Sequence, residues 1–442
     1  MSTLPPRPLS TKKFPALKGR VRIPGDKSIS HRALMLGGTA LGETRIHGIL
    51  TGEDVIATGR AMSAMGASIQ QEGEVWIARG LGVGSLIQPS SVLDMGNSGT
   101  STRLLMGLIA SNPINAKLVG DSSLETRPMN RVTIPLRMMG ADFTESAGGR
   151  LPLLVKGTSL APIEYESPVA SAQVKSCLLL AGLNAPGKTT VIEPKETRDH
   201  SERMLRAFGA EVLSEGCRAT ITGNAELIGQ TVVVPGDPSS AAFLAVAAAI
   251  TPGSDLTIEN VCLNSTRTGL LLTLQDMGAD IEYFDKRVSG GEDVADIRVR
   301  HSNLKGVTVP ADRAASMIDE YLIMSVAAAC ADGETKMLGL DELRVKESDR
   351  LAGAASILKA AGVPHQTGDD WLLVEGQGGG HGTASIPGGG QVHTKLDHRM
   401  AMATLILGGV TQAGMSVDDS NCILTSFPTF EELFASLGAR FF

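Results

Sequence analysis

One short tag recurs along the chain and constrains its fold more than any other sequence feature. An apolar stretch with helical spacing ends in Gly-Ala, or a close variant, and a strand-like run follows. The glycines of successive tags are 74, 69, 69, 84 and 76 residues apart. Glycine adopts the left-handed conformation that ends many helices without a Cβ penalty. Six near-equal units are therefore predicted, with helix-ending glycines at Gly66, Gly140, Gly209, Gly278, Gly362 and Gly438.

Each unit mixes helical and strand-like patterns. Around Gly209, for example, the pattern predicts a helix over residues 174–183, a strand over 189–192 and a second helix over 202–208. Alternation of this kind indicates the α/β class.

A longer repeat divides the six units into two halves. Residues 21–28 read VRIPGDKS and residues 232–239 read VVVPGDPS, an offset of 211 residues or about three units. Both copies lie where a strand passes into a helix, which is the expected place for the chain to cross between domains. We therefore expect one domain over residues 24–235 and a second formed by residues 1–23 together with 236–442.

The two copies also act as an internal control for charge. Lys27 and Arg32 in the first copy are replaced by proline and phenylalanine in the second, so the turn and the helix start do not require these cations. The free N–H groups at such a helix start form an anion site. The alternative is a solvated surface charge on a helix capped by Asp26 or Ser28.

Two further small-residue turns enter helices. The run NSGTSTR at residues 97–103 precedes an apolar helix, and Gly99 would let a ligand touch the backbone there. Residues 170–173 repeat this logic, with Ser171 as a plausible cap. An ordinary helix cap explains either turn equally well.

Further cations lie in loops and at helix starts. Each could instead have an ordinary structural role, such as a salt bridge between Glu347 and Arg350, three residues apart. Asp319 and Glu347 are the acid–base candidates, although an acid near a helix start often only compensates the helix dipole. Together the cations suggest a site for a strongly anionic small ligand within a protein of net charge −7. These further cations are Arg127, Arg198, Lys346, Arg350 and Arg399.

Composition excludes several classes of function. The acidic net charge and the few aromatic residues (10 Phe, 3 Tyr and 2 Trp) argue against nucleic acid and acidic membranes as partners. The longest apolar runs, such as residues 241–250, are too short to span a bilayer. The five cysteines and eight histidines show no metal-ligand spacing, so we expect reduced thiols, no metal and a cytoplasmic location.

Five segments together resemble the EPSP synthase family, in its bacterial class II form, over essentially the whole chain. They are residues 24–32 (PGDKSISHR), 96–100 (GNSGT), 171–176 (SAQVKS), 344–350 (RVKESDR) and 397–399 (DHR). The resemblance implies a two-domain inside-out α/β barrel (α+β), in which each domain has three βαβαββ units and the active site occupies the interdomain cleft.

The resemblance also implies a reaction: transfer of the enolpyruvyl group of phosphoenolpyruvate to the 5-hydroxyl of shikimate 3-phosphate, with release of phosphate. This is a step of the shikimate pathway to chorismate and the aromatic amino acids. No metal or organic cofactor is implied, a monomer is expected, and glyphosate is a possible inhibitor. By similarity, shikimate 3-phosphate would contact Lys27, Ser28, Arg32, Ser171, Ala172, Gln173, Arg198, Asp319 and Lys346. Phosphoenolpyruvate would contact Lys27, Gly99, Arg127, Gln173, Arg350 and Arg399. Asp319 would act as base on the hydroxyl, Glu347 and Lys346 would carry the proton at C3, and Lys27 would complete the catalytic set.

One position departs from the family pattern. Many members carry a lysine before the Ser-Phe-Pro motif near the C-terminus, whereas Thr425 stands here. One phosphoenolpyruvate contact is thereby placed in doubt, and Lys346 or Arg399 would take a larger share.

Two other functions compete with this interpretation. UDP-N-acetylglucosamine enolpyruvyl transferases share the fold and chemistry but carry a loop cysteine as their acid, and the loop around Arg127 has none. A non-catalytic anion-binding protein on the same scaffold would lack the acid–base pair, yet Asp319 and Glu347 are both present.

Overall fold

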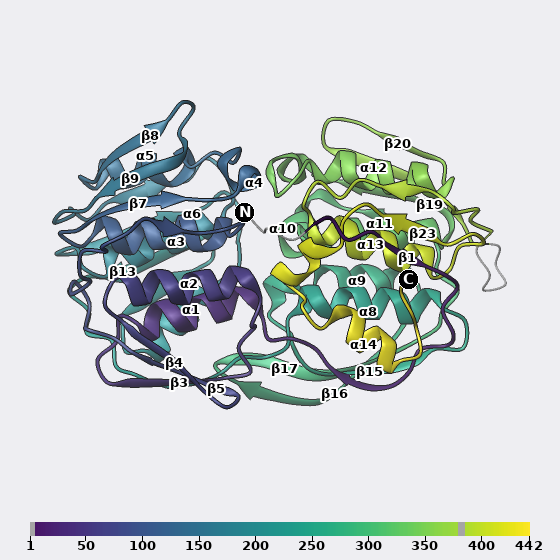
Figure 1. Ribbon diagram of the computed structural model, residues 1–442, viewed down its shortest axis with the longest axis horizontal. Coiled ribbons are helices and arrows are strands. Elements are labelled where there is room, and N and C mark those ends of the chain that lie inside the picture. The colour runs from purple at the N-terminus through teal and green to yellow at the C-terminus, as the bar shows by residue number, and fades with distance from the viewer. Residues whose placement is uncertain (1–4, 379–384) are drawn as a thin grey trace. The chain divides into compact units, whose positions relative to one another are not determined.

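The computed structural model describes residues 5–378 and 385–442, and the chain divides into two compact units (Figure 1). Unit 1 comprises Gly25–Val234 and the short turn Ser289–Glu292. Unit 2 comprises the N-terminal segment up to Pro24, Pro235–Val288 and Asp293–Phe442.

Unit 1 contains three four-stranded sheets and the helices α1 to α7. Its strands are β3 (Glu43–His47), β4 (Ser68–Glu72), β5 (Val75–Arg79), β6 (Leu93–Asp94), β7 (Asn115–Val119), β8 (Asp142–Ser146), β9 (Arg150–Lys156), β10 (Glu164–Glu166), β11 (Lys188–Ile192), β12 (Val212–Glu215), β13 (Arg218–Thr222) and β14 (Thr231–Val233). Its helices are α1 (Lys27–Gly37), α2 (Glu53–Ala64), α3 (Gly99–Ala110), α4 (Ser122–Glu125), α5 (Asn130–Met138), α6 (Ala172–Gly182) and α7 (His200–Ala207).

The described residues of unit 2 form two four-stranded sheets and one three-stranded sheet. Its strands are β1 (Leu9–Thr11), β2 (Lys18–Arg22), β15 (Asp255–Cys262), β16 (Asp280–Ser289), β17 (Glu292–Arg300), β18 (Thr308–Val309), β19 (Asp332–Leu338), β20 (His365–Thr367), β21 (Trp371–Gln377), β22 (Gln391–Val392) and β23 (Met415–Val417). Its helices are α8 (Pro238–Ile250), α9 (Gly269–Asp276), α10 (Ala314–Met317), α11 (Tyr321–Ala329), α12 (Arg350–Ala361), α13 (His398–Gly408) and α14 (Phe430–Ser436). Short 3₁₀ turns are η1 (Ser265–Arg267), η2 (Ala311–Arg313), η3 (Asp341–Val345) and η4 (Asn421–Thr425).

Five of the six described sheets repeat one strand order, which agrees with the expected βαβαββ unit, and the three-stranded sheet β1-β23-β22 departs from it. In the sheet β6-β7-β9-β8, the first two strands are parallel and β9 pairs antiparallel with both β7 and β8. The sheets β10-β11-β13-β12 and β18-β19-β21-β20 follow the same order. In these three sheets a helical crossover joins the two parallel strands, and a hairpin supplies the other two strands.

The chain passes from one unit to the other at the two copies of the longer repeat. Strand β2 precedes α1 in the chain, yet it pairs in parallel with β15 of unit 2. Strand β14 precedes α8, yet it pairs in parallel with β3 of unit 1. The last sheet is also completed from a distance, because the N-terminal strand β1 pairs antiparallel with β23.

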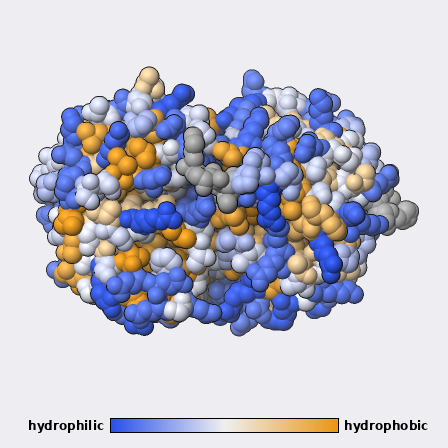
Figure 2. All heavy atoms as spheres, in the orientation of Figure 1, coloured by the Kyte–Doolittle hydropathy of each residue, from blue (hydrophilic) through white to orange (hydrophobic). Residues whose placement is uncertain are grey.

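The interior of each unit is helical, and the sheets lie outside it. All thirteen residues of α8 are buried, as are all residues of α11 and α13. In unit 1, α3 and α6 are almost wholly buried and pack on each other. Helices that are apolar on every face must lie in a core. The outer surface seen in Figure 2 mixes hydrophilic side chains with scattered apolar ones.

The six tag glycines all adopt the left-handed conformation, with φ between 78° and 106°. A Cβ on Gly140 or Gly278 would meet no atom within 4 Å, so the requirement there is conformational and not steric. The left-handed conformation of these six glycines agrees with the prediction of six units.

The described cysteines are all free, and Cys177, Cys262 and Cys422 are buried while Cys217 and Cys330 are partly accessible. Within the described part of the chain, no helix combines the length and apolar character that crossing a membrane requires.

Candidate active site

The first cationic turn lies at the start of α1. Asp26 caps this helix, because its carboxylate accepts a hydrogen bond from the Ile29 N–H at 2.8 Å. Asp237 caps α8 in the same way at the second copy of the repeat. Lys27 pairs with Asp54 on α2 at 3.0 Å. The aspartate cap is therefore common to both copies, whereas the lysine belongs to the first copy alone.

Arg32 joins three helices beneath that turn. Its Nη1 donates to the Ser28 carbonyl at 2.9 Å, its Nε to Ser201 Oγ on α7 at 2.7 Å, and its Nη2 to Ser176 Oγ on α6 at 2.7 Å. The side chain is buried, so it is no solvated surface charge.

His31 lies one residue before Arg32 and is fully buried. Its Nδ1 is 2.7 Å from Thr58 Oγ1. Burial, reinforced by the positive charges of Lys27 and Arg32, holds the pKa of His31 well below its usual value. The imidazole is therefore neutral and adds no charge to the site.

Gly99 begins α3 against two guanidinium groups. A Cβ at this position would lie 3.0 Å from Nη1 of Arg127 and 3.2 Å from Nη1 of Arg103. Arg127 is held by Asn97 Oδ1 at 2.7 Å, and Arg103 by Gln173 Oε1 at 2.7 Å. Backbone amides of a helix start and two arginines together suit an anion that carries both phosphate and carboxylate groups.

Arg103 is a site residue that sequence reasoning missed. It ends the run of residues 97–103 and stands four positions after Gly99, which places both on one face of α3. That spacing was the available signal.

The start of α6 supplies a further group of predicted residues. Ser171 caps the helix through its Oγ, which accepts from the Val174 N–H, and Ala172 and Gln173 form the first turn. The Gln173 amide donates to Thr100 Oγ1 at 3.1 Å, so α6 and α3 meet at this end. Arg198 is half-buried in the loop that leads into α7.

Unit 2 holds the other predicted residues in one ion-pair network centred on Arg350. This fully buried guanidinium pairs with Asp397 at 2.9 Å, with Asp319 at 3.1 Å and with Glu347 at 2.7 Å. Burial alone would lower the pKa of Arg350, but Asp397, Glu347 and Asp319 raise it above its ordinary value. Arg350 therefore stays charged and orients both acid–base candidates.

Lys346 and Arg350 do not share a helix. Turn η3 ends at Val345 and α12 begins at Arg350 with Asp349 as its cap, so the two cations escape the unfavourable i,i+4 spacing. Lys346 Nζ instead lies 3.9 Å from Asp319 Oδ1.

Arg399 lies in the first turn of α13, as the sequence predicted. Its backbone N–H donates to Asp397 Oδ1 at 3.0 Å, and its Nη1 donates to the Asp319 carbonyl at 2.8 Å. The buried Glu320 carboxylate lies 3.5 Å from the same guanidinium. Asp397 and Glu320 thus offset a cation at the positive end of the helix dipole. Neither acid was predicted as a site residue, because Asp397 also pairs with the distant Arg350 and Glu320 lies 79 positions from Arg399.

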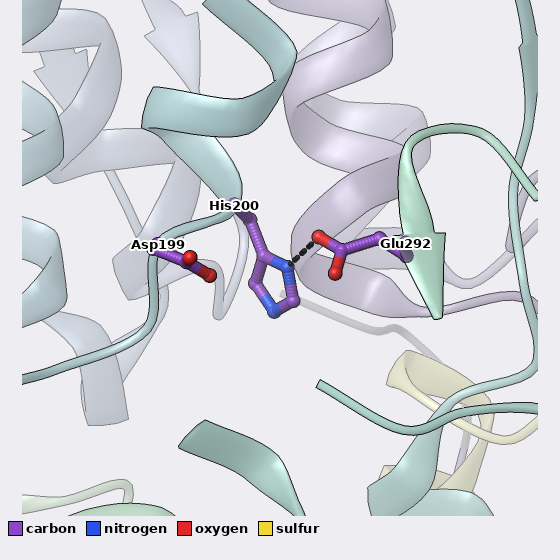
Figure 3. Close-up of side chains that lie close together, drawn as sticks. All are labelled: Asp199, His200 and Glu292. Carbon is purple, nitrogen blue, oxygen red and sulfur yellow. Dashed lines mark hydrogen bonds and ion pairs between the residues drawn. The ribbon is translucent and has the colours of Figure 1, made fainter. Parts of the chain in front are cut away.

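A separate cluster forms where Asp199, His200 and Glu292 converge in unit 1 (Figure 3). His200 Nδ1 is 2.7 Å from Glu292 Oε1, and both residues are buried. These donor atoms could in principle ligate a cation. Arg203, however, lies 2.8 Å from Asp199 and 3.7 Å from Glu292, so both acids already have a guanidinium as partner. The cluster fastens the turn Ser289–Glu292 to the start of α7.

The predicted residues thus form two groups, one in each unit. Lys27, Ser28, Arg32, Gly99, Arg127, Ser171, Ala172, Gln173 and Arg198 belong to unit 1. Asp319, Lys346, Glu347, Arg350 and Arg399 belong to unit 2. Thr425, at the end of η4, lies near the start of α13, with its Oγ1 3.4 Å from His398 Nδ1.

Comparisons with known proteins agree over nearly the full length. Residues 11–434 match the family EPSP synthase (3-phosphoshikimate 1-carboxyvinyltransferase). The 3-phosphoshikimate 1-carboxyvinyltransferases of Pseudomonas sp. (strain PG2982) and Brucella canis are each 56% identical over 441 residues, covering 98% of this chain and 97% of theirs. The structure of EPSP synthase from Acinetobacter baumannii has a TM-score of 0.88 and 43% identity, covering 98% of this chain and 99% of that one. A buried arginine network on an inside-out α/β scaffold and these matches lead to one conclusion: the chain belongs to the EPSP synthase family of 3-phosphoshikimate 1-carboxyvinyltransferases.

Proposed function

We propose that the two groups of residues, one from each unit, act on the same pair of substrates. The enzyme transfers the enolpyruvyl group of phosphoenolpyruvate to the 5-hydroxyl of shikimate 3-phosphate and releases phosphate. Each substrate carries a phosphate and a carboxylate, together about −6 at neutral pH. Seven cations are assigned to these anions: Lys27, Arg32, Arg127 and Arg198 from unit 1, and Lys346, Arg350 and Arg399 from unit 2. Four of them also pair with acids of the chain, namely Lys27, Lys346, Arg350 and Arg399.

The burial of these cations is the observation that carries the proposal. The exposed fractions of Arg32, Arg127, Arg350 and Arg399 are 4%, 5%, 1% and 7%. Arginine is rarely so buried unless it is paired or serves a binding site. Four of the seven assigned cations are therefore buried, and solubility does not explain them.

In unit 1 we assign two anion subsites. Shikimate 3-phosphate is held at the starts of α1 and α6 by Lys27, Ser28, Arg32, Ser171, Ala172, Gln173 and Arg198. Phosphoenolpyruvate lies at the start of α3 against Gly99 and Arg127, with Lys27 and Gln173 serving both substrates. Helix starts provide free N–H groups for phosphate, and the arginine fork binds a carboxylate or phosphate bidentately.

In unit 2 we assign the proton transfers. Asp319 takes the proton of the 5-hydroxyl as the oxygen attacks C2 of phosphoenolpyruvate, and it also contacts shikimate 3-phosphate with Lys346. Glu347 and Lys346 deliver a proton to C3 and later remove one, as phosphate leaves the tetrahedral adduct. Arg350 and Arg399 bind phosphoenolpyruvate. Lys27 completes the catalytic set.

The chemistry explains why acids and cations must be interleaved. A neutral vinyl carbon accepts a proton poorly, so positive charge develops at C2 and needs a shielded, preorganised environment. Asp319 and Glu347 both pair with Arg350, which holds their carboxylates in position. Many members of the family carry a lysine at the position of Thr425, and here Lys346 or Arg399 takes its share of phosphoenolpyruvate binding.

The proposal extends to the setting of the enzyme. We infer that the enzyme acts as a monomer in the cytoplasm and that glyphosate competes with phosphoenolpyruvate for the subsite at Gly99. Size-exclusion chromatography with light scattering and inhibition kinetics test the first and last of these statements.

Phosphate release is the decisive experiment. The enzyme should release phosphate from phosphoenolpyruvate only when shikimate 3-phosphate is present, and not with UDP-N-acetylglucosamine as acceptor. Release with the sugar nucleotide alone would overturn the substrate assignment. Calorimetric binding of shikimate 3-phosphate without turnover would indicate an anion-binding protein instead.

A further inference from the structure

A buried ion network lies directly beneath the residues assigned to shikimate 3-phosphate. Lys175 on α6 pairs with Glu193 at 2.9 Å and with Glu202 on α7 at 2.9 Å. Its ammonium also donates to the Thr197 carbonyl at 3.3 Å. The exposed fractions of the three side chains are 6%, 1% and 2%. One positive and two negative charges are therefore enclosed within unit 1.

Removing these three charged groups from water costs desolvation free energy, so packing alone does not explain the network. Burial alone would lower the pKa of Lys175, but Glu202 and Glu193 raise it, which keeps the ammonium charged. Replacing a buried ion pair by apolar residues of similar volume is often neutral or stabilising. What an apolar trio could not provide is directed hydrogen bonding to the loops on either side.

The two acids differ in what they hold. The Glu193 carboxylate accepts from the Ser171 N–H at 3.0 Å and from Thr197 Oγ1 at 2.9 and 2.8 Å. Glu202 accepts from Lys175 through one oxygen, and its Oε2 has no hydrogen-bond partner among the described residues. Glu193 thus fixes two loops, whereas Glu202 supplies charge.

Both loops end in residues assigned to the substrate. Ser171 starts the run Ser171–Gln173 at the head of α6, and Thr197 is the neighbour of Arg198. The same helix continues through Lys175 to Ser176, whose Oγ holds Arg32. Glu193 is therefore placed to set the spacing between the α6 turn and the arginine loop.

We propose that Glu193 is a positioning residue for shikimate 3-phosphate. It acts through Ser171 and Thr197, which fix the α6 turn and Arg198 in their binding arrangement. The inference rests on the proposed function of Ser171 and Arg198 as shikimate 3-phosphate contacts.

The chain offers a matched pair of variants. Glu193→Gln and Glu202→Gln each remove one buried negative charge beside Lys175, and only the first disturbs the two loops. For Glu193→Gln we expect the KM for shikimate 3-phosphate to rise roughly 10-fold, the scale of losing a charge-assisted hydrogen bond. The KM for phosphoenolpyruvate should stay within about twofold. Glu202→Gln should leave both KM values within about twofold while changing the unfolding temperature comparably.

A second pair keeps the test available if Glu193→Gln does not fold. Thr197→Val removes the hydroxyl at nearly constant volume and should raise the KM for shikimate 3-phosphate, whereas Thr197→Ser keeps the hydroxyl and should not. A rise in Glu202→Gln equal to that in Glu193→Gln would overturn the inference, because any loss of buried charge would then have the same effect.

Ser171→Ala separates this inference from the assignment on which it rests. An unchanged KM for shikimate 3-phosphate in Ser171→Ala would show that the proposed subsite is wrong. A raised KM in Ser171→Ala with no change in Glu193→Gln and Thr197→Val would leave the subsite standing and refute the positioning role alone.

Discussion

Adding one methyl group at Gly99 should weaken the binding of phosphoenolpyruvate and at the same time raise the stability of the fold. The new Cβ would lie 3.0 Å from Arg127 Nη1 and 3.2 Å from Arg103 Nη1, closer than the ~3.5–4.0 Å of ordinary contacts. Both guanidinium groups must then retreat by about half an ångström. Their hydrogen bonds to Asn97 and Gln173, now 2.7 Å each, would lengthen accordingly.

The size of the effect on binding follows from the contact assigned between Arg127 and phosphoenolpyruvate, which the displaced guanidinium would make less well. Weakening one charge-assisted hydrogen bond costs about 1.5 kcal/mol, so the KM for phosphoenolpyruvate should rise roughly 10-fold in Gly99→Ala. Gly99 has no left-handed φ and begins α3, so alanine should favour the helix by up to ~1 kcal/mol. Opposite signs for binding and stability distinguish this effect from general damage.

The assay combines steady-state kinetics with thermal unfolding. Gly59→Ala in α2 is the matched control, because its Cβ would meet neighbours only at 3.7–3.9 Å. That variant should gain stability with both KM values unchanged. If glyphosate shares the subsite and fills it more tightly, the ratio of its Ki to the KM for phosphoenolpyruvate should rise in Gly99→Ala. An unchanged KM together with an unchanged ratio would refute the steric argument.

Three other substitutions probe the remaining parts of the site. Asp319→Ala should lower turnover by about 10²–10⁴-fold with phosphoenolpyruvate affinity largely intact, because Arg350 retains Asp397 and Glu347; retained turnover would remove Asp319 from the mechanism. Arg127→Ala should weaken the binding of phosphoenolpyruvate by about 1.5–3 kcal/mol, which would raise its KM, and an unaltered KM would contradict that contact. Burial lowers the pKa of His31 in the folded protein, whereas in the unfolded chain the imidazole has its usual pKa of about 6.5. Below that pH the unfolded chain therefore binds one proton more than the folded protein, and the free energy of unfolding falls as the pH drops. The stability advantage of the wild type over His31→Gln should shrink by up to about 1.4 kcal/mol per pH unit in urea unfolding, and parallel pH curves would count against a neutral His31.

Local requirements made the fold readable from the sequence. A helix that must end in a left-handed residue selects glycine, and six such residues revealed six units. Small residues that cap a helix likewise located the starts of α3 and α6. The longer repeat led us to expect residues 1–23 in the second domain, but the partner strands of β2 and β14 could not be read from the sequence, because they lie more than 180 residues away.

Long-range partners were the missing part of the site as well. Arg350 and Asp397 are 47 positions apart, and Arg32 is 144 positions from Ser176 and 169 from Ser201. Spacing along one helix cannot predict such pairs. The Glu347–Arg350 pair, three residues apart, was predicted and is present at 2.7 Å.

The pairing of β1 with β23 and of β2 with β15 has a consequence for synthesis. As the polypeptide leaves the ribosome, its first two strands emerge before their partners exist, and β15 follows only after more than 200 further residues. Unit 1, which needs nothing beyond β14 for its sheets, can complete them while these leading strands still wait. A fragment starting at Pro235 would lack one edge of two sheets. It should be insoluble by itself and recoverable when a peptide spanning residues 5–24 is co-expressed.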